Sequence, residues 1–79
     1  MHEVELRINE LDVDTYLALR AGVHWKVLKQ EQAQLALKNS LYVVSAYRDG
    51  RCVGMGRLVG DGAVICYVQD LIVLPEVQS

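Results

Sequence analysis

Asp70 is the residue of this chain that is best placed to do acid–base chemistry. It lies inside an apolar segment that runs from Val68 to Leu74. A carboxylate among apolar neighbours loses hydration, which raises its pKa and allows it to accept a proton near neutral pH. The other interpretation is a structural carboxylate that is hydrogen-bonded to a neighbouring backbone or hydroxyl group. We favour the structural interpretation and keep Asp70 as a weak candidate base.

Three further side chains could contact a substrate. Trp25 and His24 are adjacent in a segment without clear periodicity, and Tyr67 lies three residues before Asp70. Trp25 could line a substrate pocket or serve as a core tryptophan, and Tyr67 could face a cleft or simply pack in the core. His24 could be a base, although a histidine in a loop is more often exposed to solvent.

The two cysteines, Cys52 and Cys66, indicate neither a disulfide nor a metal site. If their strands pair through a turn at residues 60–62, Cys52 lies opposite about Leu71 and Cys66 opposite about Arg57. The cysteines are then ~17 Å apart along the ladder, whereas a disulfide needs Cα atoms within about 7 Å. No His or Cys lies nearby at zinc-ligand spacing. We therefore expect two buried small thiols and no metal.

Composition limits the chain to one small domain. Its 79 residues are 52% hydrophobic and 23% charged, which excludes a disordered segment. The net charge of −2, with both signs interspersed, offers no basic surface for nucleic acid. No apolar run approaches the ~20 residues of a membrane span, and the N-terminus lacks the apolar core of a signal peptide. We expect a cytoplasmic protein with neither a nucleic-acid nor a membrane partner.

The first half of the chain predicts one strand and two helices. Residues 4–8 alternate apolar and charged side chains, as in a half-exposed strand. Asp12 can cap a short amphipathic helix over residues 13–21. Strong helix formers return over residues 29–38 and predict a second helix.

After residue 40 the apolar period changes to two and predicts three antiparallel strands. They cover residues 41–47, 52–59 and 63–74, with a type I′ turn at Asp49-Gly50. The order strand-helix-helix-strand-strand-strand is that of an α+β fold, an antiparallel sheet with helices packed on it. Both faces of the last strand are apolar, as in strands buried on two sides, so it lacks part of its cover and can pair with another chain.

Several motifs together resemble GNAT-type N-acetyltransferases. Residues 68–78, Val-Gln-Asp-Leu-Ile-Val-Leu-Pro-Glu-Val-Gln, are similar to the family pattern i-x-D-l-x-V-x-P-x-x-(R/Q). The Val23-His24-Trp25 loop, the Asp49-Gly50 turn and the Val53-Gly54-Met55-Gly56-Arg57 strand also match. The resemblance covers almost the whole chain. It implies the N-terminal half of the GNAT fold, ending inside the acetyl-CoA pyrophosphate motif.

The resemblance also implies a chemistry, transfer of an acetyl group from acetyl-CoA to an amine. In this family the last strand present here is bulged and splayed, and backbone groups at Leu71, Ile72 and Val73 would bind the pantetheine arm and polarise the thioester. Gln78 and Ser79 would begin the pyrophosphate loop. Trp25 and Tyr67 would line the acceptor site, with acetyl-CoA and the amine as partners. The alternative is a truncated, inactive GNAT-like module that dimerises through its last strand, so we expect either a homo-oligomer or a complementing C-terminal half.

Overall fold

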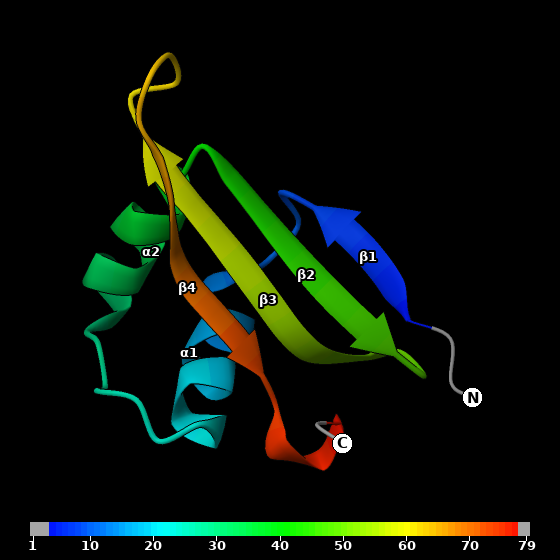
Figure 1. Ribbon diagram of the computed structural model, residues 1–79. Coiled ribbons are helices and arrows are strands. Elements are labelled where there is room, and N and C mark those ends of the chain that lie inside the picture. Colours follow the sequence, from blue (N-terminus) through cyan, green and yellow to red (C-terminus); the bar gives the residue numbers. More distant parts are fainter. Residues whose placement is uncertain (1–3, 78–79) are drawn as a thin grey trace.

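A computed structural model describes residues 4–77 as a four-stranded sheet with two helices on one side (Figure 1). The elements are β1 (Glu5–Ile8), α1 (Val13–Gly22), α2 (Gln30–Lys38), β2 (Tyr42–Arg48), β3 (Arg51–Gly60), β4 (Cys66–Val73) and a 3₁₀ turn, η1 (Pro75–Val77). The strands are antiparallel and adjacent in the order β1-β2-β3-β4. The predicted fold class and element order are therefore confirmed.

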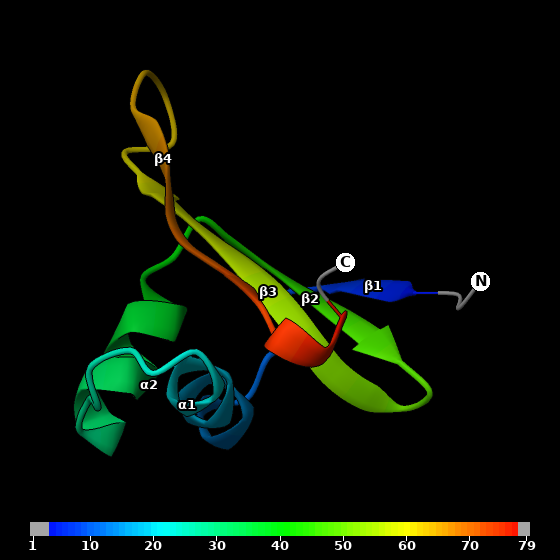
Figure 2. The same cartoon turned by 60° about the horizontal axis from the view of Figure 1, so that its bottom comes forward.

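Both helices cover the same face of the sheet, and Figure 2 shows them together on one side of the strands. Seven buried side chains from both layers form the core: Tyr16, Leu19, Ala33, Val43, Met55, Ile72 and Leu74. Tyr16 is completely buried, although it carries a hydroxyl. A buried hydroxyl needs a hydrogen-bond partner, and that partner lies in β4.

Local sequence signals set several element boundaries as predicted. The Asp12 side chain accepts the backbone N–H of Thr15 at 2.7 Å and caps α1. Asp49 and Gly50 have φ values of 54° and 78°, the two positive angles that a type I′ turn requires. This tight turn fixes how β2 pairs with β3.

The last strand begins later than its apolar pattern predicted. The Asp61 carboxylate accepts the backbone N–H groups of Ala63, Val64 and Ile65 at 2.8–3.0 Å. These bonds lower the pKa of Asp61 to about 2 and hold residues 61–65 in a loop, so β4 starts at Cys66. The loop forms the tip of a hairpin that extends beyond the rest of the sheet (Figure 1).

Because this loop is longer than predicted, the register of β4 and the burial of Cys66 both differ from the prediction. Leu71 pairs with Gly56, and Cys66 pairs with Gly60 instead of Arg57. Cys52 pairs with Tyr47 of β2. The prediction assumed a tight turn at residues 60–62, which shifted every pair. Both cysteines are free thiols, and Cys66 is exposed instead of buried.

Neither a metal centre nor a membrane span is found in the described part of the chain. No group of His, Cys, Asp or Glu within residues 4–77 could hold a metal ion. None of the helices in the same range has the length and the apolar character needed to cross a membrane.

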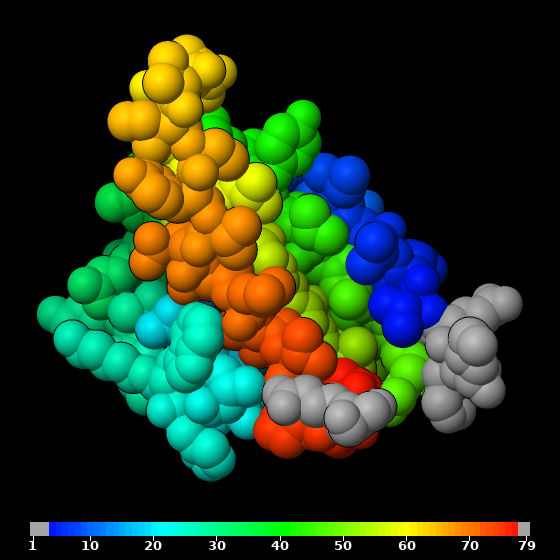
Figure 3. All heavy atoms as spheres, in the orientation of Figure 1, coloured from blue at the N-terminus to red at the C-terminus, as the bar shows by residue number. Residues whose placement is uncertain are grey.

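The face of the sheet opposite the helices is apolar and open. Figure 3 looks at the strands from this side, with β1 in blue and β4 in orange. The side chains of Leu6 and Leu71 are 67% and 68% exposed there, and Ala46, Gly54 and Gly56 lie between them in a shallow groove. The prediction that the last strand lacks cover is confirmed for the described residues.

We predict that Gly54 is needed for β4 to approach β3. A Cβ at Gly54 would lie 2.8 Å from the backbone oxygen of Ile72, so Gly54→Ala must push the strands apart. The cost of such overpacking is about 1–3 kcal/mol. A Cβ at Gly56 would lie 3.7 Å from the flexible Leu71 side chain, so Gly56→Ala is the matched control. Urea denaturation measures both variants, and equal stabilities would contradict the prediction.

Candidate functional site

The open edge of β4 is the first part of the candidate site. Arg57 pairs with Asp70 and the next residue of β3, Leu58, pairs with Val68, so Gln69 is an extra residue in β4. A β-bulge of this kind bends its strand and disrupts the regular ladder. The bulge that the family resemblance implied for this strand is therefore present, one residue before Asp70.

The backbone N–H and C=O groups of Leu71 point away from β3. The N–H of Leu74 donates to the Val53 carbonyl at 2.9 Å, which places the backbone of Leu74 on the β3 side. Since direction alternates along an antiparallel strand, the backbone of Ile72 also faces β3, and that of Leu71 faces outward. Within residues 4–77 no strand lies beyond β4. The outward N–H and C=O of Leu71 therefore lie on an open edge.

The three predicted cofactor-contacting residues of β4 thus have different surroundings. Leu71 and Val73 are 68% and 42% exposed, and the side chain of Ile72 is 1% exposed within the core. Gln78 and Ser79, the predicted start of the pyrophosphate loop, lie outside the described residues.

Asp70 is the second part of the site, a buried carboxylate bound from two sides. It is 5% exposed and accepts the Tyr16 hydroxyl at 2.5 Å and the Nε–H of Arg57 at 2.7 Å. A guanidinium nitrogen of Arg20 lies 3.8 Å from its other oxygen. A hydroxyl partner, one of the two kinds that the structural interpretation of Asp70 named, is therefore present. Within residues 4–77, every buried side-chain nitrogen or oxygen atom has a hydrogen-bond partner.

The expected rise in the pKa of Asp70 is wrong. Burial disfavours the charged form, but the hydrogen bonds from Tyr16 and Arg57, with the charges of Arg57 and Arg20, outweigh burial and lower the pKa of Asp70. The same carboxylate acts on its partner, because burial and then the bond to Asp70 raise the pKa of the Tyr16 hydroxyl. Asp70 is therefore held ionised and Tyr16 neutral around neutral pH.

The two arginines extend this cluster to α2 and to the loop after α1. Arg57 donates to the Ala36 carbonyl and to the Ser40 hydroxyl, both at 3.3 Å, at the C-terminal end of α2. A cation there also favours the helix dipole. Arg20 donates to the Lys26 carbonyl at 3.0 and 3.3 Å. We name Tyr16, Arg20, Arg57 and Asp70 the Asp70 cluster.

Trp25 and Tyr67, the predicted acceptor-site residues, lie in different parts of the molecule. Trp25 is 36% exposed, and its ring lies 5.3 Å from the guanidinium carbon of Arg20. Tyr67 is 63% exposed on β4 near the hairpin tip, so the alternative of a core tyrosine is wrong. His24 follows α1 with a φ of 60° in a backbone turn. The structure brings only Trp25 close to the Asp70 cluster.

Sequence reasoning missed the partners of Asp70. Arg20 lies one turn after Tyr16 on the amphipathic helix predicted over residues 13–21, but no role was inferred from that position. A charged residue on an apolar helix face was the available signal, because a buried charge needs an opposite charge nearby. Arg57 gave the same kind of signal, because it is a charged residue in a strand that carries few other polar residues.

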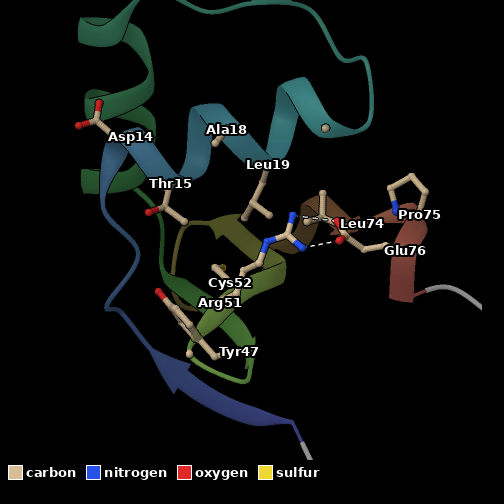
Figure 4. Close-up of a pocket in the computed structure, with 12 residues that line it drawn as sticks. Asp14, Thr15, Ala18, Leu19, Tyr47, Arg51, Cys52, Leu74, Pro75 and Glu76 are labelled. Carbon is tan, nitrogen blue, oxygen red and sulfur yellow. Dashed lines mark hydrogen bonds and ion pairs between the residues drawn. The ribbon is translucent and has the colours of Figure 1, made fainter. Parts of the chain in front are cut away.

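A separate cleft of about 530 Å³ lies on the helix side of the sheet (Figure 4). It lies between α1 and the β2–β3 hairpin, and Asp14, Tyr47, Cys52 and Leu74 are among its lining residues. Arg51 and Glu76 form an ion pair there through two hydrogen bonds. None of the predicted site residues within residues 4–77 lines this cleft.

We predict that Asp70→Asn strongly destabilises the fold. The substitution keeps the shape but leaves Arg57 and Arg20 without their counter-charge in a largely buried place. Loss of one partner of a buried pair costs about 3–5 kcal/mol. Asp14→Asn, an exposed change at the start of α1, is the control and should cost about 0.5 kcal/mol. Similar urea midpoints for the two variants would refute the prediction.

Wild type and Asp70→Asn are also expected to differ in how their stability depends on pH. Because the pKa of Asp70 is lowered by folding, its contribution to stability is present above the unfolded value near 3.9. That contribution disappears as the pH falls through the lower folded pKa. The stability difference between wild type and Asp70→Asn should therefore narrow progressively below about pH 4. Urea denaturation at several pH values measures the difference, and a constant gap down to pH 2 would exclude the mechanism.

Comparison with known proteins supports the family resemblance. No family model matches the sequence, and no curated protein matches it. Among solved structures, a Staphylococcus aureus protein of unknown function, described as a probable acetyltransferase, is 32% identical with a TM-score of 0.87. A GNAT-family acetyltransferase from Streptococcus pneumoniae is 35% identical with a TM-score of 0.83. A Xanthomonas campestris protein described as belonging to the GNAT family is 29% identical with a TM-score of 0.78.

These likenesses cover nearly all of this chain but only part of each relative. They include 96%, 96% and 99% of this chain, and 57%, 56% and 57% of the respective relatives. The chain therefore spans a little more than half the length of the proteins that it matches. In fold and in sequence, the chain corresponds to the N-terminal half of a GNAT-family acetyltransferase.

Proposed function

We propose that this chain provides the acetyl-CoA-binding strand of an N-acetyltransferase that acetylates an amine. The observation that carries the proposal is the bulged, open edge of β4 in a fold shared with GNAT-family proteins. Because the chain spans about 57% of the Staphylococcus aureus protein, the proposal for the complete reaction includes the counterpart of the remaining part of that protein.

The edge of β4 fits an extended ligand arm. Leu71 directs its backbone groups outward, and its side chain is exposed. A pantetheine arm carries amide groups, so it can bond to this edge in the way that an added strand would. Val73 and Ile72 complete the predicted contact segment, and Gln78 with Ser79 would begin the pyrophosphate-binding loop.

Acetyl-CoA, when bound, supplies an activated thioester. The contribution of the chain is to hold that group in place and to donate an N–H from the β4 edge to its carbonyl oxygen. Fixed donors aimed at developing negative charge lower the barrier to acyl transfer. This task needs a backbone amide and not a particular side chain, so an aliphatic residue such as Leu71 can perform it.

The amine acceptor is proposed to lie near Trp25, with Tyr67 as a second contact. The amine must be neutral to attack, so a carboxylate or a chain of water molecules has to take its proton. We do not assign this role to Asp70, because Tyr16 and Arg57 occupy its carboxylate and its pKa is lowered. Asp70 is proposed instead to fix the geometry of β4.

Leu71→Pro and Leu71→Ala test the proposal as a matched pair. Proline removes the outward N–H, and an edge strand tolerates it where that N–H faces away from the sheet. Alanine keeps the N–H and removes only the side chain. We expect calorimetry to detect CoA binding by wild type and by Leu71→Ala. In Leu71→Pro the affinity for CoA should fall at least about tenfold, which corresponds to the loss of one hydrogen bond between neutral groups.

Circular dichroism of both variants is the control for folding. Absence of CoA binding by wild type would refute the proposed function. Equal affinities of folded Leu71→Pro and Leu71→Ala would refute the role of the Leu71 amide. With a panel of amines and acetyl-CoA, thiol release by the chain together with its complementing half tests the complete reaction.

The second candidate is an assembly module that pairs through β4 without catalysis. The exposed side chains of Leu71 and Tyr67 on an edge strand favour it, because such edges pair with other chains. Sedimentation of wild type across a concentration series distinguishes the candidates. A monomer at all concentrations would exclude the module, and a dimer that no longer binds CoA would favour it.

A further inference from the structure

We propose that Arg20 is a positioning residue that couples the loop between α1 and α2 to the edge of β4. Residues 23–29 form this loop, which we name the Trp25 loop. The inference rests on the proposed function, because it concerns how the two substrates influence each other. Occupancy of the β4 edge would then set the position of the loop that is proposed to contact the amine.

Arg20 is in contact with both parts. Its side chain is 13% exposed, and one guanidinium nitrogen lies 3.8 Å from the Asp70 carboxylate. Two other nitrogens donate to the Lys26 carbonyl at 3.0 and 3.3 Å. Its guanidinium carbon lies 5.3 Å from the centre of the Trp25 ring. One planar cation therefore joins a strand carboxylate, a loop carbonyl and a loop aromatic ring.

The backbone of the same residue also holds the loop. The N–H of Trp25 donates to the Arg20 carbonyl at 2.9 Å, and the N–H of Val23 donates to the same oxygen at 3.3 Å. The beginning of the Trp25 loop is thus fixed to the end of α1. The Arg20 side chain adds a second attachment at the Lys26 carbonyl. The two attachments together fix the orientation of residues 25 and 26.

The link to the β4 edge is short. Asp70 precedes Leu71 directly and follows the bulge residue Gln69, so a shift of this edge moves the Asp70 carboxylate. Arg20 must follow, because separating two opposite charges in a poorly hydrated place is costly. The Lys26 carbonyl and the Trp25 ring are then displaced with the guanidinium group.

Arg57 does not provide the same link. It binds Asp70 more closely, at 2.7 Å, but its other contacts are the Ala36 carbonyl and Ser40 at the end of α2. Arg57 therefore fixes Asp70 to the helix layer, and Arg20 connects Asp70 with the loop. Coupling between the two proposed substrate sites depends on Arg20.

Arg20→Lys is the informative substitution. Lysine keeps a positive charge near Asp70, which Arg57 also neutralises, so the fold is expected to persist. Lysine lacks the planar fork that can reach a carbonyl and stack on an indole ring at the same time. Arg51→Lys is the matched control, because Arg51 is exposed and pairs with Glu76 away from the Trp25 loop.

The first measurement needs no ligand and uses the only tryptophan of the chain. Trp25 is already 36% exposed, and we expect acrylamide to quench its fluorescence with a larger quenching constant in Arg20→Lys than in wild type or Arg51→Lys. Circular dichroism and the urea midpoint show that each variant is folded. Equal quenching in all three folded proteins would overturn the inference, because Arg20 would then not hold the loop.

The second measurement follows Trp25 fluorescence while calorimetry follows CoA binding. We expect CoA to change the emission of wild type and of Arg51→Lys, and to bind Arg20→Lys with most of that change lost. Binding to wild type without a change in emission, or a full change in Arg20→Lys, would overturn the inference and leave the proposed function intact. Absence of binding to wild type would refute the proposed function, and the inference with it.

Discussion

The buried charge of Asp70 is the constraint on which the other parts of this structure depend. A carboxylate that is 5% exposed is stable only if hydrogen bonds and opposite charges replace the water that it lost. Tyr16 and Arg20 supply these from α1, and Arg57 supplies them from β3. The cluster therefore fixes β4 to the first helix and to its neighbouring strand.

Arg57 extends this constraint to the second helix. It contacts Asp70 and the last turn of α2 at the same time, so the end of that helix is placed relative to β4. Hydrophobic packing is not directional, and the core residues alone would allow the helices to slide over the sheet. Hydrogen bonds to a single carboxylate restrict that freedom, because they act only at short distances and suitable angles.

The strand that carries Asp70 has two contrasting sides. Toward the helices it provides the buried residues Asp70 and Ile72, and toward the open face it presents Leu71, which is 68% exposed. The outer edge of the same strand is open within residues 4–77. One strand thus joins the most constrained part of the fold to its least covered surface, which is where a ligand arm or a second chain would add.

The sequence alone determined the order of elements, the Asp12 cap of α1, the Asp49-Gly50 turn and the resemblance to the GNAT family. These follow from local rules: periodicity places the strands, Asp12 caps α1, and Asp49-Gly50 sets a type I′ turn. The register of β4 was set by a local loop around Asp61, which apolar periodicity does not show. Three bonds to the Asp61 carboxylate enlarge the loop, and no periodicity in the sequence reports such a contact.

The sequence identified Asp70 as the important carboxylate, but only the tertiary structure decided its state. Its apolar neighbours along the chain predicted a raised pKa, whereas Arg57 and Tyr16, 13 and 54 positions away in the sequence, lower it. Charges and hydrogen bonds act through space, so residues that are distant in the chain control a group that its sequence neighbours only surround. Local pattern therefore located the site, and the packing of α1 against β3 and β4 determined its chemistry.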